Sequence, residues 1–180
     1  MASKLIRMRK YIIFIAAFLL MSVQLMAQTP VYLTKAYQPV DSDRYKAYSS
    51  LEIQGGDVWN NCFTLGVINN YHGYATFRLG GKYECISFIL GAEKSNGGND
   101  PNIVQIHADG RRIFDYVLRD GDLGQQFTLN ISGVDKLEFS LVKPEVEAAF
   151  CEVALWTKGQ TPHDLRGKND PQVKTRMLFK

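Results

Sequence analysis

The chain has 180 residues, of which 46% are hydrophobic, 12% aromatic and 22% charged. This is the composition of an ordinary globular protein, and it excludes a disordered chain, a collagen and a polytopic membrane protein. The formal net charge of +3 arises in the first ten residues, because removing residues 1–27 leaves 17 Lys and Arg against 18 Asp and Glu. The near-neutral remainder gives no reason to expect nucleic acid or anionic lipid as a partner.

The N-terminal segment has the layout of a secretory signal. Four cations precede an apolar run over residues 11–21, and Ala27 provides a small residue at the cleavage point. The run is shorter than the about 20 residues that span a bilayer. We therefore predict that residues 1–27 are a cleaved signal peptide and that the mature chain is secreted or stays in a bacterial periplasm or cell envelope, without a membrane span. The alternative is an uncleaved anchor formed by residues 11–27.

The rest of the chain is predicted to form strands. After a lead-in over residues 28–47, short apolar or alternating segments are separated by Gly, Asn and Asp. Asp109-Gly110 between two such segments is a hairpin signal, because Gly adopts positive φ at little cost. Residues 41–50 fit a short helix, but no sustained helical stripe follows. The predicted strands cover residues 50–54, 74–79, 83–92, 103–108, 112–118, 126–131, 136–142 and 152–156. The sequence thus predicts an all-β fold, an antiparallel β-sandwich.

The composition changes after Trp156. Residues 158–180 are mostly polar and contain Pro and Gly, which predicts a C-terminal tail. Within it, residues 172–179 alternate weakly, which allows an additional edge strand.

Three cysteines remain after the signal segment: Cys62, Cys85 and Cys151. Export permits one disulfide and leaves one thiol over, and the sequence does not choose among the three pairings. The alternative is that most of them are small buried apolar residues. Their spacing matches no zinc site.

Catalytic motifs are absent from the sequence. It contains no Gly-x-Ser-x-Gly, His-Glu-x-x-His or phosphate-binding loop. Asp109, Asp120, Asp122 and Asp135 lie next to Gly or one residue from it, which is typical of turns. Two alternatives stay open: a glycosidase, which needs two carboxyls about 5–10 Å apart, and a structural calcium at Asp120-Gly121-Asp122, which lacks further EF-hand ligands. We therefore expect that the chain is not an enzyme and that it needs no cofactor.

Aromatic and amide residues in two predicted loops are the best candidates for a site. Trp59 and Asn61 precede Cys62, while Asn70, Tyr71 and His72 precede a predicted strand. A sugar presents C–H faces to an aromatic ring and hydroxyls to amide groups, so this combination suits a glycan site. These five residues are the predicted carbohydrate-binding residues. The alternative is that the rings cover the core and the Asn residues form turns.

An ordered series of short motifs runs along most of the chain. It comprises Gly66 leading to Leu79-Gly80-Gly81, an aromatic-rich segment over residues 83–91, Asp109-Gly110 after residues 104–107, Ile131-Ser132-Gly133 with Leu137, and Glu152, Ala154 and Trp156. In order and spacing, the series resembles the NPCBM/NEW2 domain family of carbohydrate-binding modules, which is related to family 51 carbohydrate-binding modules. The resemblance covers residues 48–157 and implies a jelly-roll-like β-sandwich with non-catalytic glycan binding.

The chain departs from the family pattern at several positions. The family often has His in place of Asn70 and Ser in place of Gly73, and it favours Asp-His-x-Asp-Trp where this chain has apolar Val153 and Leu155 before Trp156. Either the ligand differs or binding has been lost. Trp156 is carried over as a family position that also suits packing.

Three functions follow in order of preference. The first is a secreted, non-catalytic module that binds a glycan through loop aromatic and amide residues. The second is an envelope β-sandwich that binds or assembles with a protein and has no sugar site. The third is a small glycoside hydrolase.

Overall fold

A computed structural model describes residues 29–68, 71–93, 100–143, 146–162 and 176–178. The predicted signal peptide and most of the predicted tail lie outside these residues. Within the described part of the chain, no helix has the length and apolar character needed to cross a membrane.

The described residues form strands and one short helix. In chain order these elements are β1 (Val31–Tyr32), α2 (Leu33–Ala36), β2 (Asp41–Asp43), β3 (Tyr45–Glu52), β4 (Val58–Leu65), β5 (Val67–Ile68), β6 (Tyr71–His72), β7 (Tyr74–Arg78), β8 (Cys85–Ala92), β9 (Asn102–Ala108), β10 (Arg111–Leu118), β11 (Gln125–Asn130), β12 (Lys136–Leu141), β13 (Ala148–Trp156) and β14 (Arg176–Leu178).

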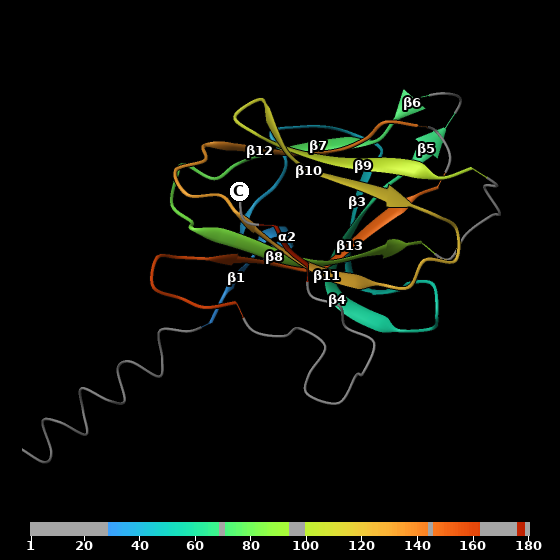
Figure 1. Ribbon diagram of the computed structural model, residues 1–180, viewed down its shortest axis with the longest axis horizontal. Coiled ribbons are helices and arrows are strands. Elements are labelled where there is room, and N and C mark those ends of the chain that lie inside the picture. The colour runs from blue at the N-terminus through green and yellow to red at the C-terminus, as the bar shows by residue number, and fades with distance from the viewer. Residues whose placement is uncertain (1–28, 69–70, 94–99, 144–145, 163–175, 179–180) are drawn as a thin grey trace, which may run out of the picture.

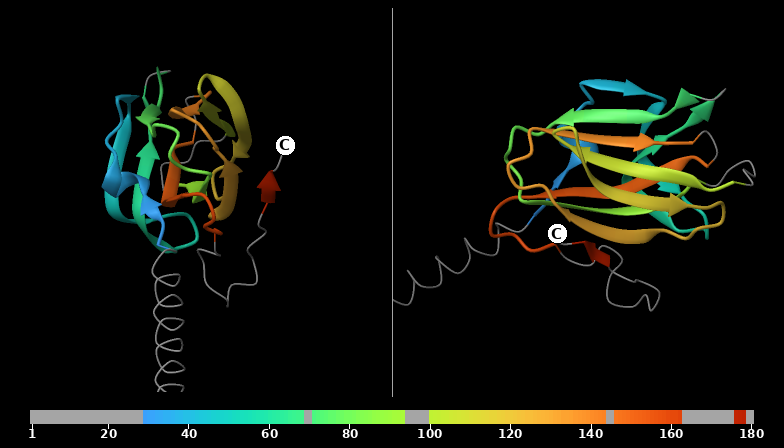
Figure 2. Two further views of the ribbon diagram at one scale, coloured as in Figure 1. Left: turned by 90° about the vertical axis from the view of Figure 1, so that its left-hand side faces the viewer. Right: turned by 45° about the horizontal axis from the view of Figure 1, so that its top comes forward.

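The strands pair into two main sheets that face each other (Figure 1). The larger sheet has the order β14-β11-β8-β13-β4-β3, with β1 also paired to β13, and the smaller has the order β10-β9-β12-β7-β2. Pairing is antiparallel except between β11 and β14, which are parallel. Figure 2 shows β14 at the open edge beside β11. The fold is an antiparallel β-sandwich of the jelly-roll kind, as predicted.

Two predictions about local structure need correction. The short helix expected over residues 41–50 is wrong, because this segment forms β2 and most of β3. The prediction also missed β4, where the turn-forming pair Asn60-Asn61 interrupts the alternation of a strand. Strand pairing decides the conformation: β2 pairs with the distant strand β7, β3 pairs with its neighbour β4, and β4 pairs also with the distant strand β13. Residues 31–47, assigned to a lead-in, contribute β1, α2, β2 and the start of β3.

The core lies between the two sheets, where period-two alternation directs one face of each strand inward. In the smaller sheet, Phe77 pairs with Leu137 and Phe139 pairs with Ala75, and all four are fully buried. Phenylalanine rings from both sheets meet in the middle of this core. They belong to Phe63, Phe77, Phe88, Phe114, Phe127, Phe139 and Phe150.

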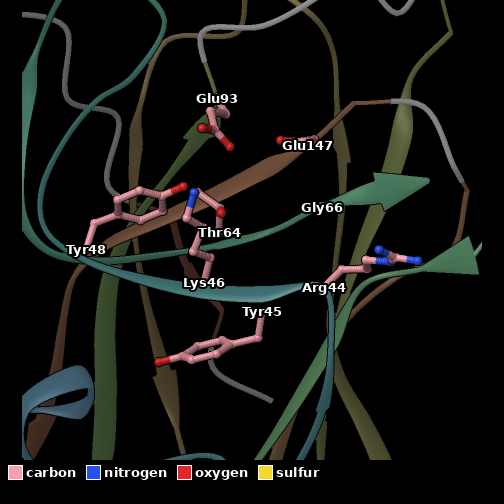
Figure 3. A pocket seen from close by; sticks show the side chains of 8 residues that line it. All are labelled: Arg44, Tyr45, Lys46, Tyr48, Thr64, Gly66, Glu93 and Glu147. Carbon is pink, nitrogen blue, oxygen red and sulfur yellow. The ribbon is translucent and has the colours of Figure 1, made fainter.

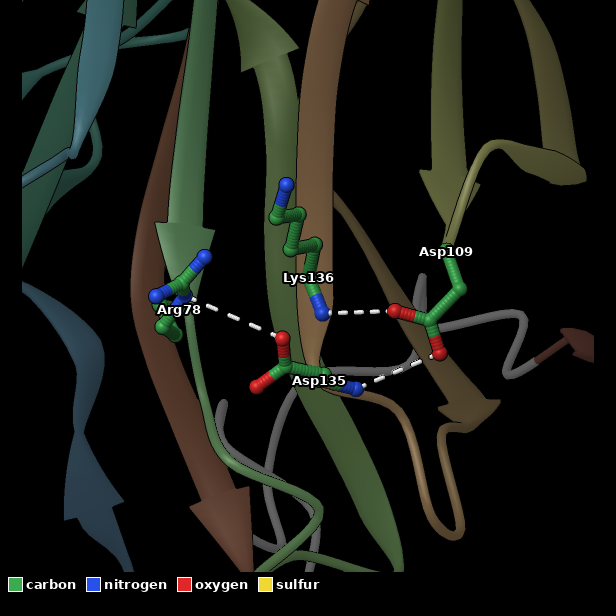
Figure 4. Close-up of polar contacts among 4 residues, drawn as sticks. All are labelled: Arg78, Asp109, Asp135 and Lys136. Atoms are coloured by element: carbon green, nitrogen blue, oxygen red, sulfur yellow. Dashed lines mark hydrogen bonds and ion pairs between the residues drawn. The ribbon is translucent and has the colours of Figure 1, made fainter.

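The predicted hairpin at Asp109-Gly110 is present and is fixed to the neighbouring strand (Figure 4). Asp109 has a φ of 48°, and its carboxylate accepts hydrogen bonds from the backbone N–H groups of Lys136 at 2.7 Å and Asp135 at 3.2 Å. Asp109 therefore links the β9–β10 turn to the start of β12. The turn interpretation of this aspartate is confirmed.

Replacing Asp109 with Ala is expected to lower the free energy of unfolding by about 1–2 kcal/mol, because two hydrogen bonds are lost and Ala tolerates positive φ poorly. Asp109→Asn keeps an acceptor oxygen and should lose less. Urea denaturation measures both. Asp135→Asn, which removes only an exposed ion pair with Arg78 at 3.7 Å, should change stability by less than about 0.5 kcal/mol. An Asp109→Ala variant as stable as the Asp135→Asn control would contradict this prediction.

Candidate functional site

The β3–β4 hairpin folds back over the outer face of the larger sheet. β4 pairs with β13 from Leu65 opposite Ala148 to Phe63 opposite Phe150. The hairpin tip nevertheless reaches the end of β8, where Ile53 forms a bridge with Glu93. The hairpin must therefore bend away from the sheet and return across it.

A second, smaller cluster of buried residues fills the space under this hairpin. It consists of Ile53, Cys62, Ile89, Ala149 and Cys151, with Tyr48, Leu51 and Trp59 packed half-buried against it. The sheet residues of this cluster alternate with Phe88, Leu90 and Phe150, which face the main core. The aromatic pair Tyr48 and Trp59, called here the aromatic platform, thus lies outside the sandwich core.

The bend in the hairpin depends on two residues with positive φ. Asn61 has a φ of 52° and Glu152 a φ of 48°. The Glu152 carboxylate accepts hydrogen bonds from the Asn60 backbone N–H at 3.1 Å and from the Asn61 side-chain amide at 3.3 Å. Burial, and then the charge and hydrogen bond of Glu152, raise the pKa of Tyr32. Glu152 therefore ties β1, β4 and β13 together where β4 leaves the sheet, as a β-bulge often does.

A disulfide joins the two strands at the same place. Cys62 follows Asn61 and Cys151 precedes Glu152, and the two cysteines are bonded, with Cα atoms 4.0 Å apart. Cys85 is a half-buried free thiol. Of the three pairings that the sequence left open, the structure selects Cys62–Cys151, and the alternative that most cysteines are simple packing residues is not borne out.

A pocket of about 340 Å³ opens beside the aromatic platform (Figure 3). Tyr48 belongs to both. Figure 3 shows the side chains of Lys46, Thr64, Glu93 and Glu147 on one side of β3. The Tyr45 ring points to the opposite side and packs on Phe63, with ring centroids 5.4 Å apart. The lining residues are Arg44, Tyr45, Lys46, Tyr48, Thr64, Gly66, Glu93 and Glu147.

Two acids, Glu93 and Glu147, face each other in this pocket. Ala92 pairs with Ala148, so the next residues outward along these antiparallel strands are opposed, and the Glu93 N–H donates to the Glu147 carbonyl at 3.1 Å. Burial, followed by the hydrogen bond and charge of Glu147, raises the pKa of Glu93 to about 7, while Lys46 opposes the shift. The pair therefore retains a proton close to neutral pH.

The groups that line the pocket are suited to binding hydroxyl-bearing ligands. Glu93 and Glu147 occupy opposed positions at the ends of paired strands, and the influence of Glu147 adds to burial in raising the pKa of Glu93. The carboxyl pair, Lys46 and Thr64 offer acceptors and donors for hydroxyl groups. The Tyr48 ring adds an apolar surface.

The structure separates the predicted carbohydrate-binding residues. Trp59 is half-buried in the platform, and Asn61 is only 7% exposed, with its amide bonded to Glu152. His72 is exposed on β6, beyond the opposite end of β4, and Figures 1 and 2 show these two regions on different edges of the sandwich. Asn70 lies outside the described residues, and for Tyr71 only the backbone is described.

Sequence reasoning missed the residues that line the pocket. Lys46 and Tyr48 lie on β3, which was expected to contain a helix, and the two acids lie at strand ends 54 positions apart in the sequence. A like-charge pair formed by strand register leaves no local signal. The half-buried residues of β3, Tyr45, Tyr48 and Leu51, recur at every third position and do not alternate, so no local pattern placed Lys46 and Tyr48 on a sheet face.

The aspartates of the suggested calcium site, and Trp156, take part in structural hydrogen bonds. Asp122 accepts from the Arg119 N–H at 2.8 Å and Asp120 from the Gln54 amide at 3.3 Å. Among the described residues, no three His, Cys, Asp or Glu side chains gather as a metal site. Trp156 is fully buried, with its indole N–H donating to Ser87 Oγ at 2.8 Å, so it is a packing residue.

The departures from the family pattern also have structural causes. Val153 and Leu155 are fully buried in the main core, so polar side chains would be unfavourable there. A Cβ on Gly73 would lie 2.6 Å from the Gly66 carbonyl oxygen, which leaves no room for a serine.

Solved structures with the same fold include two from Clostridium perfringens. The CBM51 of GH95, in complex with methyl-galactose, has a TM-score of 0.56 at 13% identity, covering 71% of this chain and 99% of that chain. The ZmpB structure that holds the M60 catalytic domain with CBM51-1 and CBM51-2 has a TM-score of 0.58 at 16% identity. The match covers 73% of this chain and 15% of the ZmpB chain.

Comparison with curated protein sequences finds no match. The family model of the NPCBM/NEW2 domain, in contrast, matches residues 22–160. This range contains both sheets apart from β14, together with the hairpin, the platform and the pocket. The chain belongs to the NPCBM/NEW2 domain family.

Proposed function

We propose that the chain is an exported, non-catalytic module that binds a glycan on the aromatic platform and in the adjoining pocket. The observation that carries this proposal is the position of Tyr48, which lines the pocket and, like Trp59, packs against the small cluster that contains the disulfide. Family membership supports carbohydrate as the ligand class. Sugar binding requires an apolar surface with a few fixed polar groups, and this place combines the two.

Of the five residues predicted from the sequence, Trp59 keeps its role in this proposal and Asn61 has a revised one. Trp59 contributes a ring to the platform, whereas Asn61 positions the hairpin through Glu152. Asn70, Tyr71 and His72 remain a predicted contact region at another edge. Export by a cleaved signal over residues 1–27 also remains a proposal, to be checked by N-terminal sequencing of the secreted protein.

Replacing Tyr48 or Trp59 with Ala is expected to weaken glycan binding by about tenfold, because a ring contact of about 1.4 kcal/mol is lost. The measurement is a glycan array followed by isothermal titration calorimetry with the highest-ranked glycan. Tyr74→Ala, on the smaller sheet, is the matched control and should bind as the wild type does. Thermal unfolding of each variant shows whether the fold is retained.

The same array distinguishes the proposed site from a glycan site elsewhere and from a protein-interaction function. Loss of binding in Tyr71→Ala or His72→Ala, with Tyr48→Ala unaffected, would move the site to the β5–β6 edge. A silent array covering host and microbial glycans, combined with sugar-independent capture of a defined envelope protein, would replace glycan binding with the protein-interaction function.

A further inference from the structure

Strand register holds the two pocket acids together. Glu93 and Glu147 extend the Ala92–Ala148 pair, and their backbones are joined by a hydrogen bond of 3.1 Å. Like charges directly opposite on paired strands repel each other at close range. Gly66 leaves room for the Glu147 carboxyl, because a Cβ at this position would lie 3.3 Å from Glu147 Oε1. The contact between the acids is therefore built into the fold.

Each cation of the pocket has a partner besides the two acids, although the charge of Lys46 also acts on Glu93 and lowers its pKa. The Lys46 ammonium lies 5.1 Å from the centroid of the Tyr48 ring. Arg44 pairs with Asp43 at 3.7 Å. Among the described residues, the charged and titratable groups that line the pocket with Glu93 are Glu147, Lys46, Arg44, Tyr45 and Tyr48. The pair relieves its repulsion by sharing a proton, in agreement with the raised pKa of Glu93.

A ligand that fills the pocket would remove water from this pair. Loss of water disfavours the charged form of a carboxyl group, so the bound state would hold the shared proton more firmly than the free state. A difference in proton affinity between the free and the bound state couples ligand binding to proton binding. Ligand binding then changes the free energy of proton binding by the same amount as proton binding changes that of ligand binding.

Resting on the function proposed above, we propose that the pocket binds an uncharged, hydroxyl-bearing sugar unit together with one proton, so that affinity falls as the pH rises from mildly acidic to alkaline. The uncharged sugar places hydroxyl groups on the carboxyl pair and a C–H face against Tyr48. A sugar carboxylate would be repelled by the remaining negative charge. An amine-bearing sugar would displace the proton and show the opposite dependence on pH.

The full mature chain is tested on an array that carries uncharged, carboxylate-bearing and amine-bearing glycans, at about pH 5.5, 7 and 8.5. Wild-type signals on uncharged glycans should fall with rising pH, by up to about tenfold for each pKa unit by which the ligand shifts the pair. Glu93→Gln keeps the shape without the charge, so its signals should be independent of pH. Glu138→Gln, on the smaller sheet beside His107, should keep the wild-type profile.

The ligand-free protein provides a second measurement. Carbon-13 NMR of the glutamate side chains should show a carboxyl titrating near pH 7, and this titration should disappear in Glu93→Gln. Because the folded state binds this proton more tightly than the unfolded chain does, the free energy of unfolding should fall as the pH rises from about 4.5 to about 7. In Glu93→Gln this decrease in the free energy of unfolding should be absent.

The outcomes distinguish this proposal from the function on which it rests. Binding that does not change with pH, or that rises with pH on amine-bearing glycans alone, would overturn proton coupling and leave glycan binding intact. If the NMR titration of the ligand-free protein shows both carboxyls titrating in the ordinary glutamate range, proton coupling is overturned as well. An array silent at every pH would overturn both.

Discussion

Phe63→Ala is expected to lower the free energy of unfolding by about 3–5 kcal/mol, the usual cost of truncating a buried aromatic ring. Phe63 is fully buried and stacks on Phe150, with ring centroids 4.8 Å apart and planes 14° apart. It also contacts Phe139 edge-on at 5.2 Å. Because these rings come from both sheets, the cavity would open where the two layers meet. A domain of this kind is stable by about 5–15 kcal/mol, so the loss is large.

Urea denaturation followed by tryptophan fluorescence measures this loss. Phe63→Leu retains most of the volume and should remain folded, with a smaller loss, which protects the test if the Ala variant does not fold. Val117→Ala, at a side chain that is 41% exposed, is the control and should change stability by less than about 0.5 kcal/mol. A loss below about 1 kcal/mol in Phe63→Ala would show that the core does not depend on this ring.

Removing the Cys62–Cys151 disulfide is expected to cost about 4–5 kcal/mol. The two cysteines are 89 positions apart, and the chain-entropy model assigns this cost to a loop of about that length. The same change would loosen the small cluster that supports Tyr48 and Trp59. Stability and glycan binding should therefore fall together.

The double variant Cys62→Ser/Cys151→Ser, measured by urea denaturation and by binding to the array, tests this expectation. Cys85→Ser is the matched control, because burial, together with the charge of Glu84, raises the pKa of the Cys85 thiol and disfavours its exchange with the disulfide. A double variant that equals this control in both measurements would mean that Glu152 and the packing of the hairpin fix the platform without the disulfide.

The two predictions concern two separate clusters of the same sheet. Phe63 and Phe150 face the main core, while Cys62 and Cys151, the neighbouring residues, face the cluster under the hairpin. Cavity formation at Phe63 should therefore reduce stability with little effect on the affinity of the folded fraction. Disulfide removal should reduce both, which allows the two roles of the sheet to be measured independently.

The sequence alone determined the class of fold and the family. Period-two alternation in β7, β8 and β12, and the turn chemistry of Asp109-Gly110, are local properties of the chain. Each follows from the geometry of an extended backbone and from the conformational freedom of Gly, so each could be predicted without knowing which strands would pair. The loop aspartates were interpreted as turn residues for the same reason.

The tertiary structure decided the pairing of cysteines, the bend of the β3–β4 hairpin and the composition of the pocket. Asn61, predicted to contact a glycan, bonds to Glu152, which lies 91 positions away in the sequence. Glu93 and Glu147 meet only because β8 and β13 pair in one register. Such contacts join residues that carry no information about each other locally, and their free energy depends on burial and on distance, both of which exist only after the sheets have assembled.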